Sequence, residues 1–326
     1  GPVIPLLGYE LTFNKGHRTV LFDSTEVCED LRVGGDPRDG AKIDLGLELY
    51  TPEADAAFTT TDGWVAEMEA AESVAGCEGV RYVSYFHHPA MRQPASVNWS
   101  LETNRVATDT VVEIVSEHGS SECYDPAWDG CDFRMNTDQH RGPSSVQAAL
   151  QQGYRLGFVG GSDNHQGHAA ELDDHVGGYS GLLIDTDGDG LGDTPRSQFA
   201  NGAITGVLYE GSLSRTTILD SIDTRHTIAS TWAFEGLRLH AFDAAGTVYL
   251  PGDDIPADAG TLTLVAELED ATVDSWYAEL VDPVTGDADP SMSFTVAAGE
   301  LRYPRIRAWI GGVEERVWGS PFFAAE

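Results

Sequence analysis

Three short apolar stretches, each followed within a few residues by histidine, restrict the fold of this chain more than any other feature. They cover residues 80–86, 111–115 and 156–159, and their length and composition are typical of buried strands. Short helices are predicted before the second and third of them, at residues 101–110 and 146–152. Strands that alternate with helices are typical of a parallel α/β sheet or barrel, where functional residues collect at the carboxyl ends of the strands. We therefore predict an α/β fold with a site at that end.

The predicted site consists of acidic and histidine residues that follow these strands. The glycines around Asp163 and His165 allow the backbone to approach a ligand closely, although Asp, Asn and Gly also form ordinary turns. Because several strands end in this way, we interpret the residues as one metal site rather than as separate turns. The candidates are Glu10, which ends a predicted strand over residues 3–13, His87 or His88, His118, Asp163 and His165.

Length and charge limit the classes of partner. The chain has 326 residues, which predicts about two domains, and a formal net charge of −34. So acidic a surface repels nucleic acid and anionic membranes, and we exclude nucleic acid as a partner. No stretch approaches the roughly 18 apolar residues that a membrane span needs. We therefore predict no membrane span.

The four cysteines, Cys28, Cys77, Cys123 and Cys131, indicate the compartment. None forms a Cys-x-x-Cys motif, which argues against a structural zinc knuckle. A disulfide between Cys123 and Cys131 would close a loop rich in Asp, Pro and Gly. The even count and the acidic surface favour an exported protein, secreted or periplasmic, with two disulfides. The alternative is four buried thiols in a cytosolic protein.

An acidic loop interrupts the pattern at residues 185–193. It carries Asp at its first, third and fifth positions and Gly at its sixth, like the start of a calcium loop. The twelfth position is Arg196 rather than the Glu of an EF-hand. The loop is therefore either a short calcium site or a solvated acidic turn. The candidate calcium ligands are Asp185, Asp187, Asp189 and Asp193.

Beyond residue 233 the pattern changes to short strands that are separated by turn signals, without helices. This pattern is typical of an antiparallel β-sandwich. We therefore predict that residues 1–233 carry the site and that residues 234–326 form a small antiparallel β-sandwich. Strands are expected at residues 237–241, 261–265, 276–280, 293–296, 302–309 and 314–318.

Five short motifs also occur in a characteristic order: Gly8-Tyr9-Glu10, residues 17–22, Phe86-His87-His88-Pro89, residues 117–122 and Gly161-Ser162-Asp163-Asn164-His165. Together they resemble the PHP (polymerase and histidinol phosphatase) superfamily, and more narrowly a large, mostly uncharacterised bacterial branch of PHP-like metallohydrolases. The resemblance extends to residues 206–231 and 318–321, and so covers nearly the whole chain. It implies a partial, distorted (β/α)7 barrel followed by a β domain.

The resemblance also implies a metal-dependent hydrolase with two or three divalent ions. Imidazole and carboxylate ligands suit zinc, manganese or iron, and such ions activate water for hydrolysis. The substrate would be a small anionic or ester compound, most simply a phosphate or related ester. The implied ligands are Glu10, which would bridge two ions, His88 with His87 as the alternative, His118, Asp163 and His165.

Three further polar residues are candidates for the catalytic machinery. His17, Arg18 and His168 would hold an anionic substrate group or support the metal ligands. A structural hydrogen-bonding role is the alternative for each of them.

One element of the family pattern is missing, because the chain contains no His-x-His motif. We expect that a separate N-terminal fragment completes the barrel; the alternative is a version that binds fewer metals and is inactive. Two functions therefore remain open. One is the metal-dependent hydrolase. The other is a non-catalytic exported protein with a degenerate barrel, which binds calcium or takes part in cell-surface interactions.

Overall fold

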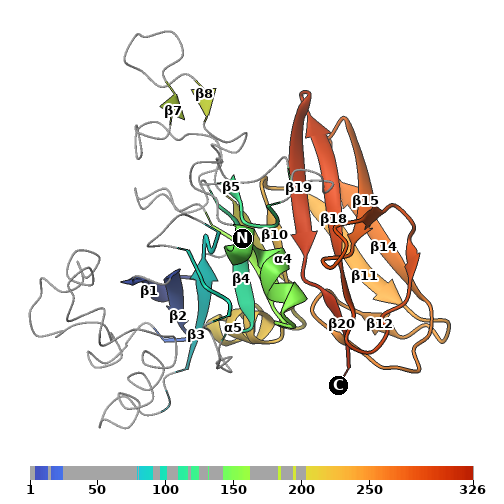
Figure 1. Cartoon of the computed structure of the whole chain (residues 1–326), viewed down its shortest axis with the longest axis horizontal. Helices are drawn as coiled ribbons and strands as arrows, with labels where there is room; N and C mark the ends of the chain where they lie inside the picture. Colours follow the sequence, from blue (N-terminus) through green and yellow to red (C-terminus); the bar gives the residue numbers. More distant parts are fainter. Residues whose placement is uncertain are drawn as a thin grey trace, which may run out of the picture.

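A computed structural model describes residues 4–13, 16–24, 79, 81–90, 96–100, 109–116, 119–124, 131, 142–161, 183–184, 194–195 and 203–325. Strands predominate in these ranges, which contain twenty strands and two α-helices, α4 (Val146–Gln151) and α5 (Arg215–Asp223). Figure 1 shows a small sheet of the first strands beside a larger body of C-terminal strands.

The first sheet mixes antiparallel and parallel pairs. Its order is β1-β2-β3-β4-β5, and β6 pairs with β4 as well. The β1–β2 and β2–β3 pairs are antiparallel, whereas β4 lies parallel to both β3 and β6. All six residues of β4 are buried, as expected for a central strand covered on both faces. The strands are β1 (Leu7–Phe13), β2 (Gly16–Phe22), β3 (Tyr82–His87), β4 (Val111–Ser116), β5 (Gly119–Ser120) and β6 (Gly157–Gly160).

One α-helix covers each face of this sheet. Leu219 and Ile222 of α5 pack against valines of β3, β4 and β6 on one face. The other face packs against α4 and the buried Trp99. Each helix begins at a serine that accepts a backbone N–H, Ser145 for α4 and Ser214 for α5.

The C-terminal strands form two further sheets that bury a common apolar core. Leu239 and Leu264 of one sheet contribute to it together with Ile306 and Val317 of the other. The larger sheet contains β9 (Ile204–Val207), β10 (Thr227–Ser230), β13 (Asp254–Ile255), β15 (Ser275–Val281), β16 (Ala288–Asp289), β18 (Leu301–Ile310), β19 (Val313–Gly319) and β20 (Phe322–Ala324). The smaller contains β11 (Gly236–Phe242), β12 (Val248–Tyr249), β14 (Leu262–Glu269) and β17 (Ser293–Phe294). A separate pair, β7 (Leu183–Ile184) with β8 (Thr194–Pro195), and a short 3₁₀ turn, η4 (Gly142–Ser144), complete the described elements.

The strands expected after residue 236 are confirmed one by one. Each of the six predicted stretches overlaps an observed strand: β11, β14, β15, β17, β18 and β19.

The prediction of a partial (β/α)7 barrel is wrong. The described strands form open sheets that are mostly antiparallel, and no barrel closes among them. Phe13 at the end of β1 pairs with Gly16 at the start of β2, and a connection this short cannot form the crossover that parallel strands need. At the other end, β10 pairs with β19, so the strand expected to end the barrel belongs to the C-terminal sheet instead.

A buried carboxylate connects the segment after β5 to the C-terminal sheet. Glu122, 1% exposed, accepts hydrogen bonds from Tyr303 Oη (2.6 Å), Arg305 Nη1 (2.9 Å) and Trp318 Nε1 (2.9 Å). Arg305 Nε also donates to Glu279, at 2.6 Å. Burial, and then the charge of Glu122, raise the pKa of Tyr303 well above its ordinary value. The cluster therefore replaces water around a buried charge with hydrogen bonds from two strands.

The expected disulfide between Cys123 and Cys131 is present, with Cα atoms 5.5 Å apart. It adjoins Glu122 in sequence and adds a covalent restraint to the same segment. Cys28 and Cys77 lie outside the described residues. No helix in the described part of the chain is long and apolar enough to cross a membrane.

We expect Glu122→Gln to lower the free energy of unfolding by about 3 kcal/mol, because it removes one partner of a buried ion pair. Urea unfolding followed by tryptophan fluorescence measures this loss. The control is Glu267→Gln, which removes the partner of exposed Arg238 and should cost less than about 1 kcal/mol. Equal losses in the two variants would show that the Glu122 cluster does not hold the segment to the sheet.

Candidate metal centre

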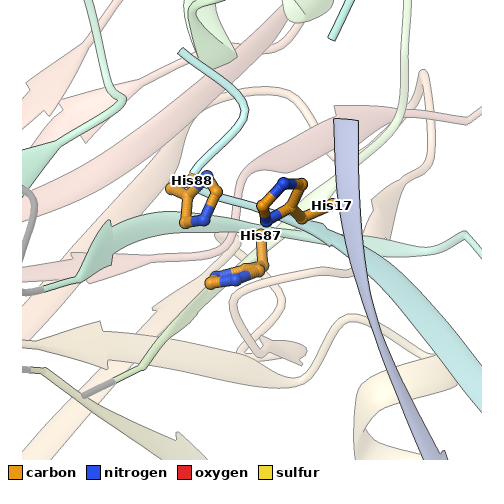
Figure 2. A group of neighbouring side chains, drawn as sticks. All are labelled: His17, His87 and His88. Carbon is orange, nitrogen blue, oxygen red and sulfur yellow. The ribbon is translucent and has the colours of Figure 1, made fainter. Parts of the chain in front are cut away.

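Three histidines converge at the end of β3. His17 of β2 and His87 of β3 lie opposite each other in the antiparallel pair, so their side chains share one face of the sheet. His88 follows β3 with a φ of 34°, in the left-handed region that a non-glycine residue rarely adopts. The ring centroid of His88 lies 3.7 Å from that of His87 and 4.8 Å from that of His17. Figure 2 shows the three rings gathered at this point.

This geometry fits a divalent metal ion. Each histidine offers one ring nitrogen, and the three nitrogens lie within 4.8 Å of one another. His87 and His88 are 4% and 3% exposed, whereas His17 is half-buried. Three imidazole ligands with a fourth position left for water or substrate are typical of catalytic zinc sites, and imidazole also suits iron. The three histidines could therefore hold a metal ion, and its presence and identity stay predictions.

Glu113 is the site residue that the sequence analysis missed. It lies in β4, is 4% exposed, and its Oε1 is 3.3 Å from His87 Nδ1. The same oxygen accepts the backbone N–H of His88, at 3.0 Å. Burial, and then the nearby Glu113 charge, raise the pKa of Tyr85 above its ordinary value. The sequence indicates it only as a single charged residue inside the apolar run at 111–115, a run that by itself predicts no more than a buried strand.

Arg18 lies on the opposite face of the sheet from the histidines. Its guanidinium pairs with Asp109, donates to Ser84 Oγ at 3.0 Å, and lies 3.9 Å from the centre of the Phe86 ring. Because neighbouring residues of a strand point to opposite faces, Arg18 cannot face the same side as His17. We therefore leave Arg18 out of the candidate site.

The structure brings together His17, His87 and His88. His17 was expected to assist catalysis, and the geometry instead groups it with the two candidate ligands. Glu10 lies in β1, where its backbone pairs with Thr19, and its side chain is not described. The remaining candidates stay predictions because they lie outside the described residues: His118, Asp163, His165, His168, Asp185, Asp187, Asp189 and Asp193.

Comparison of the chain with protein-family models, with curated proteins and with solved structures finds no match. The resemblance to the PHP superfamily therefore rests on the motifs of the sequence alone.

We expect Arg18→Met to destabilise the fold without weakening metal binding. Removing one partner of the buried Arg18–Asp109 pair should cost about 3 kcal/mol of unfolding free energy. Zinc affinity, measured by calorimetric titration of the folded protein, should stay at the wild-type value, because the pair lies on the other face of the sheet. A large loss of zinc affinity in the folded variant would place Arg18 in the site after all.

Proposed function

We propose that this protein binds a divalent metal ion (zinc, manganese or iron) through His17, His87 and His88 and is a metal-dependent hydrolase. The observation that carries the proposal is the convergence of three imidazole nitrogens within 4.8 Å at the end of a strand. A bound metal would supply the Lewis acidity that activates water and polarises an ester.

The burial of the three histidines suits this chemistry. His87 and His88 are shielded from water and provide rigid ligands, since β3 and the turn after it set their positions. His17 is more exposed than the other two, so a small substrate can approach from its side. Electrostatic interactions with a substrate are stronger in such a water-poor setting than at an open surface.

The resemblance implies further ligands, two of which follow other strands of this sheet in the sequence. The strands before His118 and Asp163 are β4 and β6, and both run parallel to each other, with β4 also parallel to β3. Parallel strands end at one edge of a sheet, so the ends of β3, β4 and β6 lie at the same edge. On the strength of the resemblance, we propose Glu10, His118, Asp163 and His165 as ligands of a second or third ion, and phosphate or related esters as the substrates.

We also propose that the protein is exported. The Cys123–Cys131 disulfide supports this, because disulfides persist in secreted and periplasmic proteins and are rare in the cytosol. The strongly acidic composition is compatible with it.

The test is metal binding and hydrolysis by histidine variants of the full chain. We expect His17→Ala and His87→Ala each to lower zinc affinity by more than about 100-fold, since losing even an outer-shell partner costs about 10–100-fold. Zinc titration and metal analysis of the purified protein measure this. Hydrolysis of p-nitrophenyl phosphate and bis(p-nitrophenyl) phosphate should fall with the bound metal.

His240→Ala is the matched control, because His240 is a half-buried histidine on β11 of the C-terminal sheets. It should bind zinc like the wild type. Full zinc binding by both site variants would refute the metal site. Metal binding without hydrolysis of any ester would refute the enzyme and support the non-catalytic alternative.

A further inference from the structure

We propose that Glu113 is the positioning residue of this metal centre: it orients His87 and fixes the backbone of His88 without binding the metal itself. The inference rests on the proposed function, and adds a specific role for a residue on a different strand.

One carboxylate oxygen of Glu113 contacts both His87 and His88. Glu113 Oε1 lies 3.3 Å from His87 Nδ1 and accepts the His88 backbone N–H at 3.0 Å. When His87 Nδ1 carries the proton and donates a hydrogen bond to Glu113, Nε2 keeps its lone pair for a metal. One oxygen therefore sets the ring orientation of one ligand and the backbone position of the next.

The backbone of His88 has an unusual conformation. A φ of 34° is unfavourable for a non-glycine residue unless its surroundings hold it. The hydrogen bond from its N–H to Glu113 is such a restraint, and this conformation keeps the ring of His88 close to those of His17 and His87. Loss of the carboxylate would release the ligand from this position.

The second carboxylate oxygen of Glu113, Oε2, lies beside Gly161. A Cβ added to Gly161 would lie 2.3 Å from Glu113 Oε2, so this oxygen occupies the space that a side chain at position 161 would need. Gly161 N in turn donates to Val115 O of the same strand, at 3.1 Å. The Glu113 carboxylate therefore lies between the histidines and the residue that follows β6, and a side chain at position 161 would require the carboxylate to move.

Glu113 differs in its contacts both from the candidate metal ligands and from the buried carboxylate of Glu122. The possible metal-ligand atoms that lie within 4.8 Å of one another come from the three histidines, and the carboxylate oxygens of Glu113 are not among them. In the described part of the chain, the donors to Glu113 belong to His87 and His88, whereas the buried Glu122 is held by Tyr303, Arg305 and Trp318. A buried charge needs such partners, and those of Glu113 are the candidate ligands.

The decisive variant is Glu113→Gln, which keeps the size of the side chain and removes its charge. Zinc affinity should fall about 10–100-fold, as for other partners of metal-bound histidine. At saturating Co(II), the visible absorption bands should change in position or intensity, because the ligand geometry changes. Glu122→Gln is the matched control: it also neutralises a buried carboxylate, but should leave the zinc affinity and the cobalt spectrum of the folded protein unchanged.

A second variant displaces the carboxylate without removing it. Gly161→Ala places a methyl group against Glu113 Oε2 and should also lower zinc affinity and alter the cobalt spectrum. Gly236→Ala is its control, since the nearest atom to an added Cβ there is 3.5 Å away. This pair decides the question even when Glu113→Gln does not fold.

The outcomes separate the two proposals. A wild-type protein that binds neither Zn(II) nor Co(II) refutes the proposed function, and with it the role of Glu113. A wild-type protein that binds both ions, with wild-type affinity and spectra in Glu113→Gln and Gly161→Ala, leaves the metal centre standing and overturns the role of Glu113.

Discussion

The buried carboxylate of Glu122 connects the part of the molecule that carries the histidines to the part that supports it. Its partners lie on β18 and β19, while its own segment continues from β4 and β5. The preceding residue, Ser121, accepts a hydrogen bond from the backbone of Ala90, two residues beyond His88. The contacts thus run from the core of the C-terminal sheet to the segment after β3.

The two buried glutamates show how similar chemistry has different uses in one fold. Glu122 is surrounded by groups that remain donors under all ordinary conditions, an arginine, a tyrosine and a tryptophan, so it stabilises a fixed contact. Glu113 instead faces an imidazole and a strained backbone N–H. An imidazole can take up a metal on its far nitrogen while its near nitrogen keeps the hydrogen bond. That difference in partners, more than burial, is why we assign a functional role to Glu113 alone.

The sequence pattern located strands well, and the expected parallel arrangement holds for β3, β4 and β6 but not for β1 and β2. The strands after residue 236, the Cys123–Cys131 disulfide and the histidines at the end of β3 were all expected. The barrel was not found, because an apolar run has no information on whether its neighbour is parallel, and the short β1–β2 connection made that pair antiparallel. The role of Glu113 was not predicted, because its partners, His87 and His88, belong to β3 and the turn after it. His17 was recognised, but only the β2–β3 register shows that it faces His87.

A cluster of buried histidines is costly for a fold that does not use it. Each imidazole loses water on burial, and His88 adds a left-handed backbone to that cost. A divalent metal ion bound at the proposed site would compensate for this cost through one nitrogen of each of the three rings. Departures from local rules that gather at one point are expected at functional sites, where stability is given up for chemistry. The coincidence of three histidine rings, a strained turn and a buried carboxylate is therefore the ground on which we propose a metal site here.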